Sequence, residues 1–349
     1  MMTGRHQPHF SIALAIAVAN CLLASLAAGH GGGMLVQTLD GKLVMGYDDD
    51  LNNQEIMGVR AFSGQFPSFF AWNDPGFLSL SNPPAGYGAL PTGQEVFWDF
   101  LPMTVGGVTS NLLYWDGAGG TLEDVAFATS SQAGLKMTLY GRNNQAASAD
   151  GTPQMIPGKV LERTLTSGSL RLHAHQFFSL EIDGGGTPAE GFYLVALQLR
   201  MNDLRATEPF YVAWGTLGAS LAVLDGTVVP WIDARVDELV RPGDFTFDGR
   251  VDGGDFLVWQ RQYGMSGPFP LDGAKPDGDG DGTVGTEDLV VWTEGFGAGA
   301  QPAAAPPLAA VPEPPAMELV AVALVLSAPM LLSRLFSAPG SARGSKTAQ

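Results

Sequence analysis

The sequence predicts a mainly β protein, an antiparallel β-sandwich or jelly roll joined to a small helical module and a C-terminal apolar helix. Only 15% of the 349 residues are charged, whereas Gly (46) and Pro (24) are abundant. That composition is typical of short strands and turns rather than of long helices. Tyr193, Val195, Leu197 and Leu199 alternate along the chain, which predicts one core-facing side of a strand.

The expected sandwich covers residues 30–240, and no amphipathic helix is predicted there. Turn dipeptides such as Asp40-Gly41 and Asp225-Gly226 separate short apolar runs. The predicted strands are Leu35–Leu39, Leu43–Tyr47, Glu95–Leu101, Leu112–Trp115, Val125–Ala128, Lys136–Tyr140, Val160–Leu165, Ser169–Leu172, Gln176–Ile182, Gly191–Arg200, Glu208–Trp214 and Ala219–Leu224.

Charge and cysteine content exclude several classes of function. The formal net charge is −17, and an acidic chain is not expected to bind nucleic acid, which requires clustered Lys and Arg. Cys21 is the single cysteine and lies in an apolar leader. The expected mature chain therefore has no disulfide and no cysteine-based metal site.

The first 29 residues have the order of a signal peptide. Arg5 precedes an apolar stretch from Phe10 to Ala28, and small residues end it at Ala27, Ala28 and Gly29. We therefore expect export, with the mature chain beginning near residue 30. The alternative is an uncleaved N-terminal anchor.

The strongest signal is a repeat with a period of 33 residues. Twelve-residue segments begin at Asp244 and at Asp277, and each has acids at positions 1, 5 and 12 and glycine at position 6. This is the pattern of a calcium loop, because calcium takes six to eight oxygen ligands and the glycine permits the tight turn. Each loop precedes a short predicted helix that carries a tryptophan four residues past position 12.

These paired loop–helix units resemble the dockerin type I domain, and residues 241–298 are expected to form a dockerin-like module with two calcium sites. The resemblance implies a cohesin-type partner protein. By position, it also implies the ligands Asp244, Thr246, Asp248, Arg250 (carbonyl), Asp252 and Asp255 for the first site, and Asp277, Asp279, Asp281, Thr283 (carbonyl) and Asp288 for the second.

The acidic charge is concentrated around this module. Residues 237–294 hold thirteen acids against four Lys and Arg, a net charge of −9. Without a cation these carboxylates repel one another, so calcium binding is expected to be coupled to folding. Chelation is then expected to unfold residues 242–297 and to leave the β domain folded.

The C-terminal region has a linker, a short motif and an apolar run in sequence. Residues 299–310 form a Pro/Ala linker, and residues 311–349 hold the Val-Pro-Glu-Pro motif at Val311–Pro314, an apolar run at Leu319–Leu332 and dispersed basic residues. This order resembles a PEP-CTERM sorting signal, which implies processing by an exosortase-type sorting protease and attachment to the membrane through a C-terminal transmembrane helix. A permanent single-pass anchor is the alternative.

Chemistry in residues 30–240 is limited to two open hypotheses. His173 and His175 would share one face of a strand, and His30 falls near the expected cleavage point, so these histidines could hold zinc or copper. Carboxylates at Glu95, Asp99 and 123–124 leave room for a glycosidase pair, although turn caps and solvated edges are the plainer interpretation.

The sequence therefore predicts an exported calcium-binding protein of the cell surface or extracellular matrix with a non-catalytic role. One alternative is a component that binds or degrades polysaccharide and assembles through its dockerin-like module; its candidate sugar-stacking residues are Trp72, Trp98, Trp115 and Trp214. A second alternative is a histidine-based metal-binding ectodomain.

Overall fold

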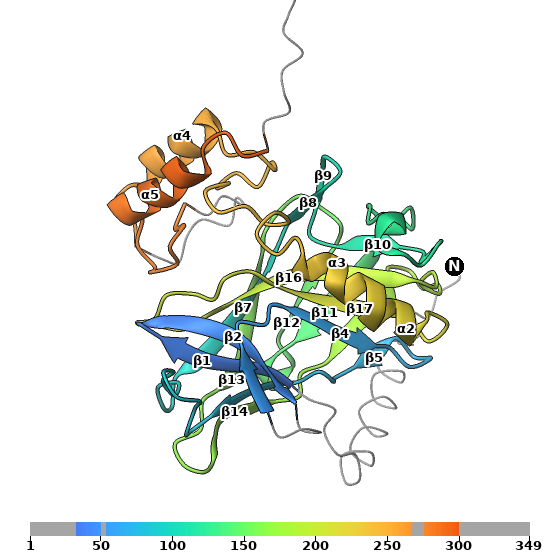
Figure 1. Ribbon diagram of the computed structural model, residues 1–349, viewed down its shortest axis with the longest axis horizontal. Helices are drawn as coiled ribbons and strands as arrows, with labels where there is room; N and C mark the ends of the chain where they lie inside the picture. Colours follow the sequence, from blue (N-terminus) through green and yellow to red (C-terminus); the bar gives the residue numbers. More distant parts are fainter. Residues whose placement is uncertain (1–32, 50–53, 267–275, 300–349) are drawn as a thin grey trace, which may run out of the picture. The chain divides into compact units, whose positions relative to one another are not determined.

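A computed structural model describes residues 33–49, 54–266 and 276–299 (Figure 1). The strands are β1 (Gly33–Leu39), β2 (Lys42–Asp49), β3 (Gln54–Met57), β4 (Ala61–Gln65), β5 (Ala71–Trp72), β6 (Phe77–Leu80), β7 (Glu95–Leu101), β8 (Met103–Val105), β9 (Val108–Ser110), β10 (Leu113–Trp115), β11 (Leu135–Tyr140), β12 (Ala146–Ala149), β13 (Ile156–Arg163), β14 (Leu170–Ala174), β15 (Phe178–Ile182), β16 (Phe192–Arg200) and β17 (Phe210–Gly215). The helical elements are η1 (Leu122–Asp124), η2 (Arg142–Asn144), α2 (Leu221–Val223), η3 (Leu224–Val228), α3 (Val229–Asp233), α4 (Gly253–Gln262) and α5 (Thr286–Gly295).

The described strands form four sheets, and the mainly β class is confirmed. The first sheet has the order β14-β6-β1-β2-β3, the second β13-β7-β16-β17-β4 with β10 also paired to β16, the third β12-β11-β15-β5, and the fourth is the β8-β9 pair. The first two sheets are mixed, because β1 runs parallel to β6 and β17 runs parallel to β4, whereas the other two sheets are antiparallel. The prediction of a purely antiparallel sandwich or jelly roll is therefore wrong at these two pairs, which join strands far apart in the sequence.

The first hairpin shows how local sequence determines register. Leu39 pairs with Lys42 across the two-residue loop Asp40-Gly41. Both loop residues have positive φ, 49° and 76°, as a type I′ turn requires, and Asp-Gly is a preferred pair for that turn. The turn sets the register of β1 against β2 along their full length.

Two hydrophobic clusters lie on opposite sides of β16. Tyr193, Val195, Leu197 and Leu199 all lie in the larger cluster, to which strands of the first three sheets contribute. This confirms the predicted core face. The intervening residue Leu194 belongs to the second cluster, which also contains residues from β10 and from the helical segment after β17. Strand β16 is therefore buried on both faces.

Two predicted strands are wrong. The Val125–Ala128 segment forms only an isolated bridge between Tyr114 and Ala128. Ala219–Leu224 runs into the helical segment α2–η3–α3 instead, which covers the outer face of β17 in Figure 1. Leu224, Val228 and Ile232 are four residues apart and almost fully buried, the spacing of a helix face rather than a strand.

The described residues contain no helix long and apolar enough to cross a membrane. The predicted signal peptide at 1–29, His30, all but the first residue of the predicted linker at 299–310, and the sorting signal at 311–349 lie outside the described residues.

Candidate metal centre

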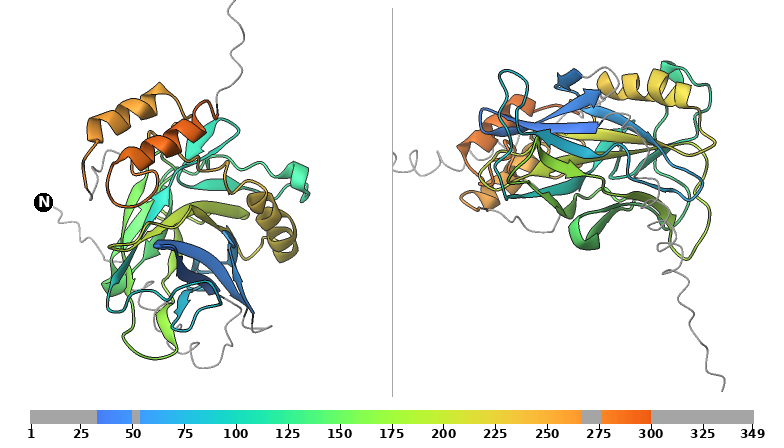
Figure 2. Two further views of the ribbon diagram at one scale, coloured as in Figure 1. Left: turned by 60° about the vertical axis from the view of Figure 1, so that its left-hand side comes forward. Right: turned by 90° about the horizontal axis from the view of Figure 1, so that it is seen from below.

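Two ten-residue helices follow the two predicted calcium loops. Helices α4 and α5 lie side by side in both views of Figure 2 and begin nine residues into each loop. Loop position 6 is Gly249 in the first loop and Gly282 in the second, with φ of 83° and 88°, so each supplies the left-handed residue that the turn requires. Asp255 and Asp288 fall in the first turn of each helix, where backbone N–H groups favour a carboxylate.

The two loops repeat the same hydrogen bonds at equivalent positions. The position-6 amide donates to the position-1 carboxylate, from Gly249 to Asp244 at 2.7 Å and from Gly282 to Asp277 at 3.1 Å. The position-9 amide likewise donates to the carboxylate at position 12, at 2.8 Å for Asp255 and at 2.6 Å in the second loop. Two segments 33 residues apart therefore adopt one loop geometry.

The remaining predicted ligands divide into two groups. Thr246 contacts both ends of its loop, with its hydroxyl 3.0 Å from Asp255 and 3.5 Å from Asp244. Three carboxylates of the second loop, those of Asp277, Asp279 and Asp281, have ligand oxygens within 4.8 Å of one another. The second group is Asp248, Arg250, Asp252 and Thr283, which are all exposed, as Asp281 is too. Asp252 caps α4 by accepting a bond from the Gly254 amide.

The carboxylates at both ends of each loop are buried. Asp244, Asp255, Asp277 and Asp288 are 6%, 0%, 7% and 1% exposed. Burial is the main cause that raises the pKa of Asp244 to about 7, and the neighbouring Asp255 adds to it. Burial also raises the pKa of Asp255 and of Asp288. In the described part of the chain no Lys or Arg forms an ion pair with Asp244, Asp255 or Asp288, and the donors to these three carboxylates include several backbone N–H groups.

Each loop–helix unit is held by contacts with the other loop–helix unit. The Trp259 indole N–H donates to the Gly285 carbonyl at 2.7 Å, and the Trp292 indole N–H donates to the Asp252 carbonyl at 2.9 Å. Both acceptors are at position 9 of the opposite loop. Phe256 also packs against Trp292, with ring centroids 5.2 Å apart. Neither loop is therefore complete without the helix that follows the other.

The residues at loop position 8 also form hydrogen bonds between the two loop–helix units. Val284 of the second loop bonds through its backbone to the segment after α4, and Val251 of the first loop bonds to the segment after α5. Both valines are 1% exposed. Together with the tryptophan bonds, they make residues 242–266 and 276–299 a reciprocally closed pair of loop–helix units.

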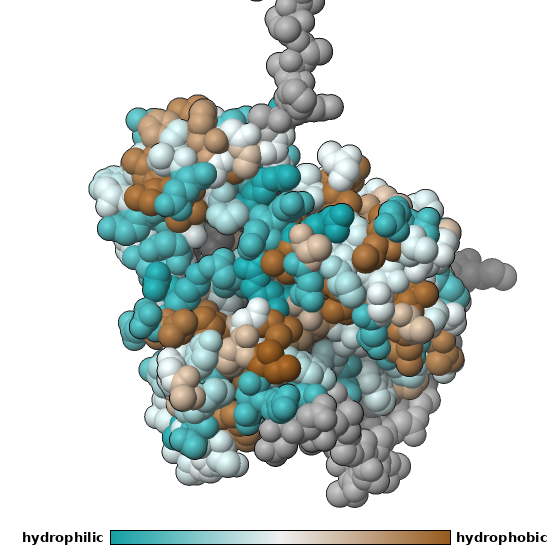
Figure 3. Space-filling model, in the orientation of Figure 1, coloured by the Kyte–Doolittle hydropathy of each residue, from teal (hydrophilic) through white to brown (hydrophobic). Residues whose placement is uncertain are grey.

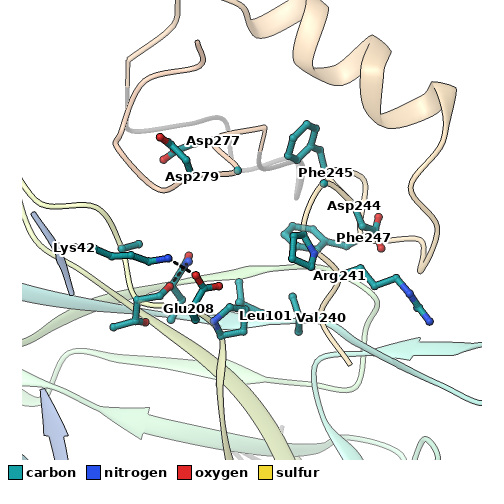
Figure 4. Close-up of a pocket in the computed structure, with 17 residues that line it drawn as sticks. Lys42, Leu101, Glu208, Val240, Arg241, Asp244, Phe245, Phe247, Asp277 and Asp279 are labelled. Atoms are coloured by element: carbon teal, nitrogen blue, oxygen red, sulfur yellow. Dashed lines mark hydrogen bonds and ion pairs between the residues drawn. The ribbon is translucent and has the colours of Figure 1, made fainter. Parts of the chain in front are cut away.

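The module is attached to the β sheets through its loops. Phe247, at position 4 of the first loop, is 8% exposed and belongs to the second hydrophobic cluster together with Leu101 and Met103. In the second loop, the Gly280 carbonyl accepts a 2.9 Å bond from the Ala206 amide. Figure 4 shows the pocket between these contacts, whose lining includes the Lys42–Glu208 ion pair and the loop residues Asp244, Asp277 and Asp279. Described residues of the sheets and of the module belong to one compact unit.

Charge also connects the second loop with β16. Arg200 on β16 forms a two-pronged ion pair with the buried Asp99. Burial lowers the pKa of Arg200, but Asp99 and then Asp277 outweigh it and raise the pKa overall. Asp99 is therefore engaged structurally, and Glu95 pairs with Arg163 at 3.6 Å. Neither carboxylate is placed as a free acid for glycoside hydrolysis.

The predicted histidine pair is brought together in the structure, whereas three of the predicted sugar-stacking tryptophans are buried. His173 and His175 do come together, with Nε2 atoms 3.1 Å apart, which confirms their shared face. Trp98, Trp115 and Trp214 are 0%, 3% and 0% exposed, so they are core residues and present no stacking surface for sugars.

Comparisons with protein-family models, with curated proteins and with solved structures found no match to this chain.

Proposed function

We propose that the chain is an exported, non-catalytic surface protein whose residues 242–299 bind two calcium ions. The observation that carries this proposal is the pair of buried carboxylates at positions 1 and 12 of both loops. Burying an ionised carboxylate is unfavourable unless a cation or hydrogen bonds compensate it. Calcium supplies two positive charges to oxygen ligands only, which matches these acids and a threonine hydroxyl.

Each residue type has a defined part in this proposal. The carboxylates at positions 1 and 12 neutralise the ion and join the start of the loop to the helix, and the acids at positions 3 and 5 complete the second site. In the first site Thr246 replaces an acid with a neutral hydroxyl, so that site carries one charge fewer at position 3. Ligand charge is one determinant of calcium affinity, which favours tighter binding in the second loop at that position.

The contacts with the β sheets favour a structural role for the ions. Phe247 and Gly280 join the loops to the sheets, so ordering the loops also orders this joint. The linker and sorting signal are predicted to follow directly after the module. We propose that calcium stiffens the base of the ectodomain at the point where the chain leaves it for the membrane.

A protein partner of the cohesin type is the second candidate. Leu257 and Val290 are equivalent positions of α4 and α5, as are Tyr263 and Phe296 just past each helix. The four side chains are 46%, 55%, 55% and 60% exposed. Figure 3 shows brown, apolar surface over these helices. Exposed apolar groups of this kind favour a protein contact. The burial of Trp98, Trp115 and Trp214 argues against a polysaccharide platform built on them, and of the four candidates only Trp72 is half-buried.

The test is calorimetry of the full chain with calcium and with a chelator. Asp255→Ala and Asp288→Ala each remove a buried position-12 carboxylate, and Glu287→Ala removes an exposed acid beside one of them. We expect calcium to raise the melting temperature of the wild type and of Glu287→Ala, and to do so less in the two aspartate variants. Equal melting of the wild type with calcium and chelator would refute the proposal.

A further inference from the structure

We propose that His173 and His175 form a site for one divalent transition-metal ion of the zinc or copper type, separate from the calcium loops. His173 lies on β14 and His175 follows its last residue. Strand β14 is an edge of the first sheet. Residues two apart on a strand point to the same side, and the two rings meet there at 78° with centroids 4.9 Å apart.

The hydrogen bond on the far side of His175 sets its tautomer. Its Nδ1 lies 3.3 Å from the backbone carbonyl of Asn73. A carbonyl only accepts, so Nδ1 carries the proton and Nε2 presents its lone pair. An imidazole whose outer nitrogen donates to a backbone carbonyl is the usual arrangement of a metal-binding histidine.

The distance between the two ε nitrogens fits a shared ion. Metal–nitrogen bonds of about 2.05 Å and the 3.1 Å separation give a nitrogen–metal–nitrogen angle of about 98°. That angle lies between square-planar and tetrahedral geometry, so it suits both copper and zinc. His173 is exposed, so solvent can move its proton from Nε2 to Nδ1 as the ion binds.

The His175 ring lies close against the backbone of Gly76, where a larger residue would collide with it. A Cβ built on Gly76 would lie 2.8 Å from Nδ1 and 3.0 Å from Cε1 of His175. Gly76 in turn accepts a 2.8 Å bond from the Met34 amide, which holds it against β1. The second histidine is thus placed by the sheet and by a close glycine.

Among the described residues no third His, Cys, Asp or Glu completes a group with the pair within 4.8 Å. Two histidines are fewer ligands than the four of a structural zinc site. Imidazole nitrogens also favour transition metals over calcium, so the two kinds of site in the chain select different ions.

The experiment is equilibrium dialysis of Zn²⁺ against the full chain saturated with Ca²⁺, so that the loop acids are occupied. We expect His173→Asn and His175→Asn each to lower bound zinc by one equivalent per chain, or to weaken its binding by about tenfold or more. Ser167→Ala, an exposed change before the same strand, should leave zinc binding unchanged. Equal zinc binding by all four proteins would overturn the proposal.

A measurement on the unaltered chain guards against misfolding of the variants. One equivalent of Cu²⁺ added to the calcium-saturated chain should give an electron paramagnetic resonance spectrum with coupling to imidazole nitrogen, and Zn²⁺ should displace that copper. A spectrum with oxygen ligands alone would contradict the histidine site.

Discussion

Replacement of Phe247 tests whether the first calcium loop is anchored in the core of the β domain. The Phe247 ring is 92% buried, being only 8% exposed. A buried phenylalanine removes about 150–250 Å² from water, which at about 25 cal/mol per Å² corresponds to about 4–6 kcal/mol. Because the unfolded chain already buries part of that area, we expect Phe247→Ala to lower the free energy of unfolding by about 3–5 kcal/mol.

The backbone conformation of Phe247 makes the result of this substitution easier to interpret. Phe247 has φ of 57°, a left-handed conformation that is unfavourable for any residue with a Cβ. Alanine keeps that cost, so the substitution measures the packing of the ring alone. Phe296→Ala is the matched control, because that ring is 60% exposed and its loss should cost about 1 kcal/mol.

Denaturant unfolding in saturating calcium is the assay, with the midpoint compared at constant slope. The expected order of stability is wild type, then Phe296→Ala, then Phe247→Ala. If Phe247→Ala were no less stable than Phe296→Ala, the ring would not lie in the second hydrophobic cluster, and the joint between module and sheets described above would be wrong.

Three further predictions concern the loops. Asp288→Ala should remove one of two bound calcium ions, counted by flow dialysis, whereas Glu287→Ala should keep both. Gly249→Ala and Gly282→Ala both place alanine at a positive φ, which costs about 1–2 kcal/mol, but only at Gly249 would the new Cβ meet a side chain of β8. Thermal denaturation should therefore show the larger loss of stability for Gly249→Ala. Equal losses of stability in the two variants would contradict that contact. Since the pKa of Asp244 is raised to about 7, calcium binding should release protons at pH 6 and almost none at pH 8.5. Calorimetry in buffers of different ionisation enthalpy measures this release. Proton release that does not depend on pH would contradict the burial of this carboxyl group.

The same carboxyl predicts the pH dependence of the calcium-free chain. The folded-state pKa of Asp244 lies above the ordinary value of 3.8, so the folded state binds more protons than the unfolded state between these values. Its contribution therefore stabilises the calcium-free fold at low pH and is lost as pH rises from about 4 to about 7. Unfolding in chelator at several pH values measures this trend, and a rise in stability across that window would contradict it.

The parts that were predictable from the sequence are those governed by short-range spacing. The 33-residue period placed both loops and both helices, because loop residues and helix caps are set within a dozen residues. The alternation in β16 predicted its core face, and the Asp40-Gly41 turn lies at the first hairpin. The spacing of His173 and His175 similarly predicted that their rings meet.

Long-range pairing was not predictable in this way. The parallel pairs β1–β6 and β17–β4 join segments whose partners no local pattern identifies. Phe247 lies in a glycine-rich acidic loop whose composition predicts solvent exposure, yet it is buried by strands remote in sequence. The helical segment after β17 was mistaken for a strand and a turn because Asp225-Gly226 interrupts its apolar spacing, although Leu224 and Val228 already show the four-residue period.

The most direct test of the central claim is the number of calcium ions bound by the full chain at neutral pH. Flow dialysis with radioactive calcium, read against protein concentration, measures it without any variant. We expect two ions per chain, both removed by chelation together with a loss of thermal stability. No bound calcium at millimolar concentrations would contradict it, because the buried acids of the two loops would then be balanced by protons or hydrogen bonds alone.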